Sequence, residues 1–269
     1  MNSLVDWEKK HVGWEIYDIE DEFSRQGLNY VKSCAYNFPY LKTPQPKEGE
    51  PKRESINWRL ILNKNRSGFR ICQSYPWMFV VPLNVPEAVL TEVIAYRSKQ
   101  RIPILSYFWK NPAFKDGGVT LWRSAQSLSG YGTSRSFEDE FYLLSLDSPS
   151  TTIDFHGMKQ EKNNNSVKSW KKNIHVFDCR PYSAAWGNKL AGKGYEDEKC
   201  YDNMTLTFHD IQNAPTIGTC HKDINKTIAN FEAKDYLDSL AKSNWIQYIA
   251  RILIMVKDIL TEFKNGVTS

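Results

Sequence analysis

The chain has 269 residues, of which 41% are hydrophobic and 25% are charged. This composition is typical of a folded globular protein and excludes a disordered tail or a low-complexity scaffold. The formal charge of +4 is too small to indicate a nucleic-acid-binding protein. No apolar run approaches the roughly 20 residues that cross a bilayer, and residues 1–10 are too polar for a secretion signal. We therefore expect a cytoplasmic protein.

The amino-terminal part of the chain predicts one helical or extended segment followed by a loop. Residues 13–28 mix aromatic and charged side chains and predict a lead-in helix or an extended arm. Residues 43–53 contain three prolines and a glycine, which a helix or a central strand does not accommodate. We interpret residues 43–53 as a solvated loop.

The middle of the chain has the alternation of strands and helices that is typical of an α/β domain. Apolar runs predict strands over residues 58–62, 69–72, 77–81, 102–109, 119–123, 174–178 and 206–211. The run at 77–81 is continuously apolar, as expected of a strand that is covered on both faces. Helical spacing of apolar residues predicts a helix over residues 87–97, with Pro86 suited to its first turn.

Two polar stretches predict surface segments. Residues 147–172 predict a long surface insertion, and its basic cluster at 168–172 is either solvated or in contact with acidic lipid headgroups. Residues 180–195 are interspersed with glycines and predict a loop.

Residues 245–263 carry the clearest helical pattern in the chain. Their apolar side chains fall on one stripe, with Ser243 or Asn244 as the N-cap and Gly266 as the stop. We expect this stripe to face the core. The alternative is a helix that lies on a membrane surface, but its polar face carries charges of both signs, whereas membrane-surface helices are usually strongly basic.

The sequence offers little support for catalysis, for a metal or for a cofactor. The five cysteines contain no Cys-x-x-Cys pair, the five histidines lack metal-site spacing, and no glycine-rich nucleotide loop occurs. His209 and Asp210 are adjacent on a predicted strand and would point to opposite faces, so we favour a structural role for both.

A cysteine phosphatase needs a Cys-x5-Arg loop, because the thiolate attacks phosphorus while the arginine and backbone amides hold the phosphate oxygens. None of the cysteines has an arginine six positions later. Cys220, with Lys226 at that position, comes nearest. Because a lysine lacks the two parallel donors of a guanidinium group, we expect no catalytic residue among these 269.

Short motifs nevertheless follow one another in a recognisable order along the chain. They are Gly13-Trp14-x-x-Tyr17-Asp18, Arg25-Gln26-Gly27, Cys72-x-x-Tyr75-Pro76, Val80-Val81-Pro82, Arg97-Ser98-Lys99-Gln100-Arg101, Arg123-Ser124-x-Gln126, Asp178-x-Arg180-Pro181, Gly194-Tyr195-Glu196 and Phe208-x-Asp210-Ile211-x-Asn213. In this order they resemble the myotubularins, a family of phosphoinositide 3-phosphatases with a cysteine-phosphatase fold.

The resemblance implies a fold and a binding site. The fold is an incomplete α/β, protein-tyrosine-phosphatase-like domain over residues 13–269, with a mixed sheet flanked by helices, after an extension over residues 1–12. The resemblance places Asn188 and Asn213 in the phosphoinositide pocket, with Ala214 as a neighbour where isoleucine is the family's residue. The alternative is that both asparagines only satisfy the backbone of turns.

The sequence also departs from the family. Myotubularins carry a membrane-binding domain before the Gly-Trp segment, and a strand and the loop Cys-Ser-Asp-Gly-Trp-Asp-Arg after the last helix; these 269 residues contain neither. Without these segments we expect exposed apolar strand edges and faces, and a chain that is marginally stable or depends on a partner.

Three functions stay open. The first is an inactive module that binds a phosphoinositide headgroup or a homologous myotubularin-like subunit, in peripheral contact with endosomal membranes. The second is a truncated fragment of an active phosphatidylinositol 3-phosphate or 3,5-bisphosphate 3-phosphatase. The third is a different enzyme that uses Cys220.

Overall fold

The computed structural model describes residues 19–26, 58–65, 68–69, 71–114, 118–131, 135–147, 155, 158, 173–201, 203–230 and 235–269. Its helices are α2 (Ile19–Arg25), α4 (Glu87–Tyr96), the 3-10 helix η2 (Ser98–Gln100), α5 (Phe137–Asp147), α7 (Tyr182–Leu190), α8 (Ala214–Ala229), α9 (Tyr236–Lys242) and α10 (Trp245–Lys264). Its strands are β1 (Trp58–Leu62), β2 (Lys64–Asn65), β3 (Gly68–Phe69), β4 (Met78–Pro82), β5 (Ile104–Lys110), β6 (Gly118–Arg123), β7 (Ile174–Asp178) and β8 (Met204–Phe208).

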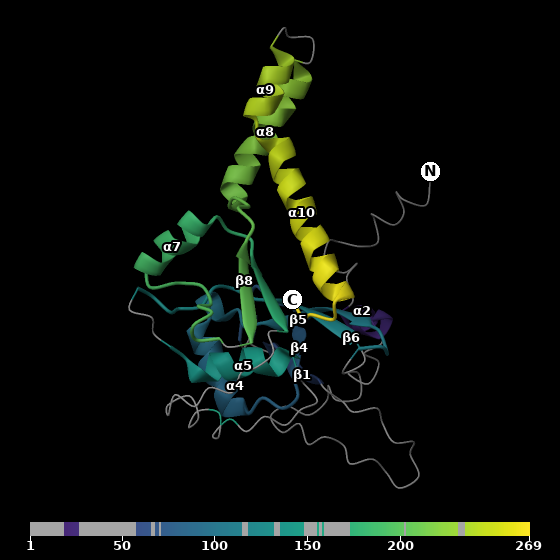
Figure 1. Ribbon diagram of the computed structural model, residues 1–269, viewed down its shortest axis with the longest axis vertical. Helices are drawn as coiled ribbons and strands as arrows, with labels where there is room; N and C mark the ends of the chain where they lie inside the picture. The colour runs from purple at the N-terminus through teal and green to yellow at the C-terminus, as the bar shows by residue number, and fades with distance from the viewer. Residues whose placement is uncertain are drawn as a thin grey trace.

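The chain is a mixed α/β protein, as the sequence predicts. In the described part, the strands form four two-stranded sheets: β1–β4, β2–β3 and β5–β6 are antiparallel, and β7–β8 is parallel. Helices α4 and α5 lie against the strands, whereas α8, α9 and α10 form an arm that projects from the body (Figure 1). The carboxyl terminus returns from the arm into the body, close to the strands (Figure 1).

Several predicted strands have different bounds in the structure, and one helix was predicted as a loop. The strand predicted at 69–72 is only the two-residue β3, and β8 begins and ends earlier than the prediction of 206–211. The predicted loop at 180–195 was wrong over α7, which begins after Pro181 and buries Ala185. Residues such as Gly187 and Asn188 are poor helix formers, so intrinsic propensity does not reveal this helix.

Two predictions fall largely on residues that the structure does not describe. The loop at 43–53 and the basic cluster at 168–172 lie outside the described residues. Within the insertion predicted at 147–172, Met158 is buried in the core and Phe155 packs edge-on against Phe141. At least this part of the insertion contributes to the core instead of lying on the surface.

Strand β4 is the centre of the core because both of its faces are covered. Phe79 and Val81 point into a large cluster with α4 and α5, and Met78 and Val80 point into a second cluster that includes Phe23 of α2. This alternation confirms the prediction of a strand buried on both faces.

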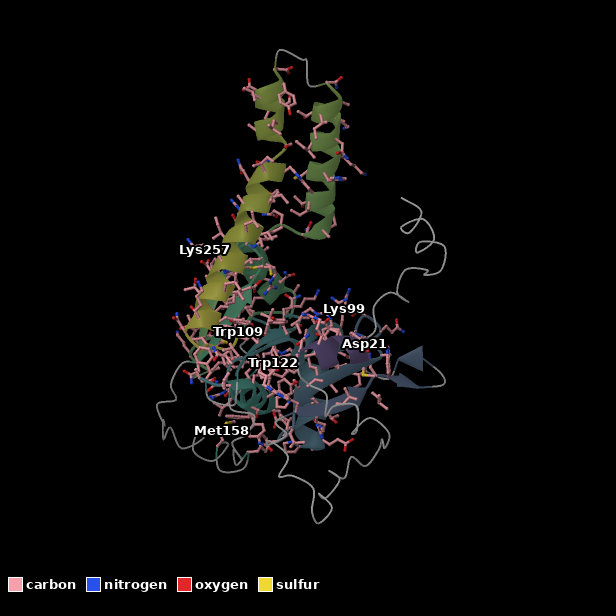
Figure 2. The ribbon with its side chains drawn as sticks, turned by 90° about the vertical axis from the view of Figure 1, so that its right-hand side faces the viewer. Asp21, Lys99, Trp109, Trp122, Met158 and Lys257 are labelled. Atoms are coloured by element: carbon pink, nitrogen blue, oxygen red, sulfur yellow. The ribbon has the colours of Figure 1, made fainter. Side chains whose placement is uncertain are left out.

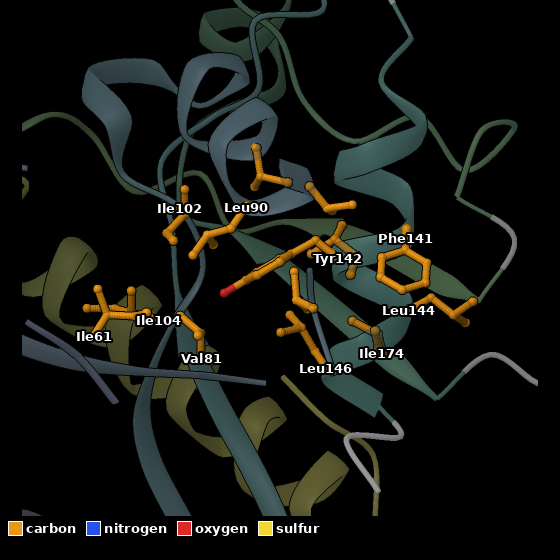
Figure 3. Close-up of a cluster of buried hydrophobic side chains, with 14 of the residues drawn as sticks. Ile61, Val81, Leu90, Ile102, Ile104, Phe141, Tyr142, Leu144, Leu146 and Ile174 are labelled. Carbon is orange, nitrogen blue, oxygen red and sulfur yellow. The ribbon is translucent and has the colours of Figure 1, made fainter. Parts of the chain in front are cut away.

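Tyr142 of α5 lies in the middle of the larger cluster (Figure 3). Its hydroxyl donates a hydrogen bond of 2.6 Å to the main-chain oxygen of Pro103. The buried polar end of the ring therefore has a partner, as the low dielectric of the core requires.

A buried charge cluster fixes the positions of α4, α5 and the loop after α7. The Arg97 side chain, at the end of α4, is 2% exposed and binds Asp139 of α5 through two hydrogen bonds of 2.7 and 2.5 Å. Its third nitrogen donates to Glu196 and to the main-chain oxygen of Ala125. Burial by itself would lower the pKa of Arg97, but the two carboxylates raise it well above its usual value. Arg97 is therefore a permanent cation at the junction of three segments.

Replacing Asp139 with Asn should destabilise the chain strongly, because it leaves the buried Arg97 guanidinium with one carboxylate less. Removal of one partner from a buried ion pair typically lowers the free energy of unfolding by about 3–5 kcal/mol. Urea denaturation followed by circular dichroism measures the change. Arg25→Gln, which breaks the exposed Arg25–Glu22 pair, is the control and should leave the midpoint unchanged. Equal midpoints for D139N and the native chain would contradict a stabilising role.

Candidate functional site

The candidate site lies at the edge of the parallel pair where β7 and β8 both end, which we call the carboxyl edge. Asp178, the last residue of β7, pairs with Phe208, the last residue of β8. The chain continues from β7 into α7 and from β8 into α8, and both helices lie beyond the same end of the strands (Figure 1). Ligands of α/β proteins commonly bind outside the carboxyl ends of parallel strands.

Arg180 fastens three segments at the carboxyl edge. Its guanidinium binds both carboxylate oxygens of Asp178, at 2.9 and 2.5 Å, and donates to the main-chain oxygen of Gly194 at 3.0 Å. It also donates to the side chain of Gln126, in the loop after β6. These contacts engage the guanidinium within the protein, so Arg180 holds the edge together instead of presenting a free cation to a ligand.

Asn188 lies on the last turn of α7 and is half-buried. Its main-chain oxygen accepts hydrogen bonds of 3.0 Å from the amides of Ala191 and Lys193, which end the helix. Its side-chain amide has no hydrogen-bond partner among the described residues. The neighbouring Lys189 places its ammonium group 4.8 Å from the centre of the Tyr195 ring.

Asn213 is the N-cap of α8. Its side-chain oxygen accepts a 3.0 Å hydrogen bond from the Thr216 amide and a 2.9 Å bond from the Thr216 hydroxyl. The Asn213 side-chain oxygen therefore does satisfy a backbone amide, which is the alternative that the sequence left open. The side-chain NH2 group stays exposed, beside the exposed Ala214 in the first turn of the helix. The two asparagines thus lie on different helices that leave the same edge.

Two histidines lie between the parallel strands and α10. His175 hydrogen-bonds to Glu262 of α10 at 3.1 Å and to the Thr207 hydroxyl at 2.7 Å. His209 follows β8 and has a buried Nε2 atom without a hydrogen-bond partner among the described residues. Burial lowers the pKa of His209, and the nearby Asp258 only partly opposes this shift. Sequence spacing does not reveal the His175 contacts, because Glu262 lies on α10 and Thr207 on the neighbouring strand β8.

Polar contacts, not the apolar stripe, attach α10 to the carboxyl edge. Arg251 donates to the main-chain oxygen of Asp210 at 2.6 Å and to its carboxylate, while Glu262 binds His175. Asp210 has a left-handed backbone with φ of 51°, which turns its carbonyl towards Arg251. Arg251 and Glu262, which a sequence plot assigns to the solvent side, therefore face the body, whereas Lys257 and Lys264 are exposed.

The prediction that the apolar stripe of α10 faces the core is wrong for most of its length. Leu253 and Leu260 are 63% and 54% exposed, and Ile249, Ile252 and Val256 are exposed beside them. Only at the lower end does the stripe pack, where Phe263 stacks on Tyr107 and Trp109 at ring distances of 6.4 and 6.3 Å. Figure 2 shows the arm standing clear of the body above Trp109. Among the described residues, no helix is long and apolar enough to cross a membrane.

Among the described residues, neither Cys220 nor Cys179 has the surroundings of a nucleophile. Cys220 belongs to α8 and is buried, with 8% of its surface exposed. Cys179, next to the carboxyl edge, contacts the sulfur of Met255 at 3.7 Å, and burial raises the pKa of its thiol. A raised pKa disfavours the thiolate that a cysteine nucleophile requires. No group of three or more metal-ligating side chains occurs within the described residues.

Comparison with known proteins identifies the family. A family model described as "Myotubularin-like phosphatase domain" matches residues 3–268. The chain belongs to the myotubularin family. It is 30% identical to myotubularin from Xenopus laevis over 260 residues, which are 95% of this chain and 35% of that protein.

Other relatives have names that specify lipid substrates. The chain is 30% identical to bovine (Bos taurus) phosphatidylinositol-3,5-bisphosphate 3-phosphatase MTMR2 over 272 residues, covering 99% of this chain and 34% of the relative. It is 28% identical to human (Homo sapiens) phosphatidylinositol-3-phosphate phosphatase MTMR7 over 257 residues, covering 94% and 31%. The chain thus spans about a third of the length of these relatives.

The stability of the chain should fall as the pH drops below the usual histidine pKa of 6.5, in part because of His209. The folded state holds the pKa of His209 below that value, so the unfolded state binds more protons in this range. The difference in unfolding free energy between the native chain and His209→Gln should therefore shift against the native chain as the pH falls from 7.5 to 5. His221→Gln, at an exposed histidine of α8, is the control. A pH-independent difference for H209Q would contradict this assignment.

Proposed function

We propose that these 269 residues form a myotubularin-type module that binds phosphoinositide headgroups at the carboxyl edge without hydrolysing them. The observation that supports the proposal is that Asn213 caps α8 just after β8, while Asn188 lies on the last turn of α7, the helix that follows the neighbouring strand β7. The family membership supports the ligand class, since relatives are named as phosphatases of phosphatidylinositol 3-phosphate and 3,5-bisphosphate.

The donors at this edge suit a phosphorylated inositol. The NH2 groups of the two asparagines can donate hydrogen bonds to phosphate oxygens or ring hydroxyls without adding charge. The first turn of the 16-residue helix α8 adds the partial positive charge of a helix amino terminus. Lys193, whose amide donates to the main-chain oxygen of Asn188, supplies a full positive charge close by.

Hydrolysis is not expected from these residues alone. The sequence contains no Cys-x5-Arg loop, so it provides neither the thiolate nor the arginine clamp of the family reaction. A reaction at Cys220 would have to begin from a buried thiol. Phosphate release from phosphatidylinositol 3-phosphate that disappears in Cys220→Ser would establish the third function and refute this proposal.

A truncated fragment of an active phosphatase is the second candidate, and one observation favours it. The chain spans about a third of its relatives' length, while the apolar face of α10 lies uncovered. The codons after that of Ser269 discriminate between the two candidates. A Cys-x5-Arg loop there would make the chain the front part of an enzyme, and a stop codon would leave the binding module.

The uncovered face of α10 supports binding of a second protein as well. We define this face by its exposed aliphatic side chains Ile246, Ile249, Ile252, Leu253, Val256 and Leu260. An apolar stripe of this length is typical of a helix that packs against another protein surface. We infer that the partner is a homologous myotubularin-like subunit. The exposed Lys257 (Figure 2) and Lys264 are basic groups on α10 that suit additional, peripheral contact with an anionic membrane.

Asn213→Asp should weaken phosphoinositide binding while preserving the helix cap. An aspartate oxygen still accepts from Thr216, but the NH2 donor is lost and the new negative charge repels phosphate. We expect at least a tenfold loss of affinity for vesicles that contain phosphatidylinositol 3-phosphate, measured by co-sedimentation, and about a fivefold loss for Asn188→Ala.

Asn225→Asp is the matched control for the asparagine variants. It adds the same charge at an exposed position of α8, away from the amino-terminal turn. N225D should bind like the native chain. Equal binding by N213D and N225D would contradict a site at the carboxyl edge.

The double change Leu253→Gln and Leu260→Gln should reduce association through α10. Each exposed leucine contributes about 1.5–3 kcal/mol when fully buried, so losing both should weaken association at least tenfold. Analytical ultracentrifugation at rising protein concentration measures the effect, with Lys222→Gln as a control that leaves the apolar area intact. A native chain that stays monomeric at high concentration and unfolds cooperatively would contradict a dependence on a partner.

A further inference from the structure

Helix α7 carries a stripe of large apolar side chains on its solvent side. Tyr182, Trp186 and Leu190 follow one another at intervals of four residues, which places them on one face of the helix. Each of the three is between 45% and 59% exposed, whereas Ala185 marks the buried side. The helix lies at the outer edge of the body, beyond the ends of β7 and β8 (Figure 1). It therefore turns its largest apolar side chains away from the core.

A neighbouring loop extends this apolar surface. A Cβ added to Gly130 would lie 3.7 Å from the Cα of Gly192, so the loop after β6 approaches the turn that ends α7. Leu128 and Tyr131, on either side of Gly130, are both exposed. Together these exposed apolar residues form a surface that we call the α7 patch: Leu128, Tyr131, Tyr182, Trp186 and Leu190.

Aromatic contacts fix the base of the α7 patch on the parallel strands. The Tyr182 ring packs edge-on against Phe208, the last residue of β8, at a centroid distance of 5.3 Å. Tyr195 packs edge-on against the same ring at 5.4 Å. These contacts hold the first turn of α7 in place, so Trp186 and Leu190 are presented on a rigid support.

The segments that carry the α7 patch are basic. Residues 124–131 and 179–195 contain three basic residues and no acidic one. Arg180 is bound to Asp178, whereas Lys189 and Lys193 lie on either side of Leu190 in the sequence and are half-buried. A half-buried lysine can lay its aliphatic stem along apolar surface and keep its ammonium group in water. The patch therefore suits a surface that is both apolar and anionic.

The size and the chemistry of the patch favour a bilayer over a protein partner. A protein interface of standard size engages about 20–30 residues on each side, and the α7 patch has five. Three of the five are Trp or Tyr, which concentrate at the boundary between lipid headgroups and acyl chains because their rings are apolar at one end and polar at the other. A helix that lies in this boundary, with lysines beside its apolar face, is typical of peripheral membrane binding.

We propose that the α7 patch is a membrane-docking surface for an anionic bilayer. Trp186 and Leu190 enter the boundary between headgroups and acyl chains, and Lys189 and Lys193 contact anionic headgroups. Because Asn188 lies on the same helix, docking through α7 brings the carboxyl edge to the membrane surface. The inference rests on the proposed membrane contact, which it assigns to α7, and it does not require recognition of a phosphoinositide.

Co-sedimentation with vesicles of phosphatidylcholine and phosphatidylserine, without any phosphoinositide, tests the proposal. The double change Trp186→Ser and Leu190→Ser removes apolar surface from the patch and should weaken binding at least tenfold. Trp77→Ser is the matched control, because Trp77 is 41% exposed against 45% for Trp186 but precedes β4. W77S should bind like the native chain. A native chain that does not bind these vesicles, or a double variant that binds equally well, would overturn the proposal.

Trp186→Leu provides a second measurement that keeps the patch apolar. W186L should still bind the vesicles, but it should lose most of the tryptophan quenching that brominated acyl chains cause in the native chain. Trp77→Leu should retain that quenching. Equal quenching in W186L and the native chain would contradict insertion of α7.

Two further outcomes separate this inference from its alternatives. If the double serine variant binds vesicles normally but loses self-association in analytical ultracentrifugation, the α7 patch is an interface between copies of the chain and the proposal fails. Because the vesicles contain no phosphoinositide, a negative result here leaves the Asn213→Asp test of headgroup binding standing. Equal headgroup binding by N213D and N225D would likewise leave docking through α7 unaffected.

Discussion

A buried ion pair between Arg97 and Asp139 joins the end of α4 to α5 inside the body. A guanidinium that is removed from water needs carboxylates at fixed positions, and here they come from α5 and from the loop after α7. Tyr201 donates a third hydrogen bond to Asp139 at 2.6 Å and so ties in the segment before β8. Segments that are separated by up to about a hundred residues of sequence are thereby held in one arrangement.

The loop after α7 connects this buried ion cluster to the carboxyl edge. Glu196 binds Arg97, and two residues earlier the oxygen of Gly194 binds Arg180. Gly194 also approaches Ser129 so closely that an added Cβ would lie 1.9 Å from its hydroxyl oxygen, so a side chain there would displace Ser129. The loop that contains Gly194 and Glu196 therefore connects the buried ion cluster around Arg97 with the partly exposed one around Arg180.

The outer face of α10 is apolar and exposed where the helix leaves the parallel strands. Exposed apolar faces of this kind are surfaces through which protein chains associate. In the proposed function, the amides of Asn188 and Asn213, the amino terminus of α8 and Lys193 would recognise a phosphorylated headgroup, whereas hydrolysis needs a nucleophile and an arginine clamp.

Motif order and apolar periodicity are local properties of a chain, so they were enough to predict the family, the α/β class, the buried strand β4 and the helix at residues 245–263. The sequence also singled out Asn188 and Asn213, although only through the resemblance to myotubularins. Contacts between segments set the remaining features: α7 replaces a predicted loop, Arg180 is engaged by Asp178 and Gln126, and Arg251 and Glu262 of α10 face the body. Periodicity shows that a helix has an apolar face, but which face is buried depends on the residues that other segments place against it. Here Asp210 and His175 bind polar side chains of α10.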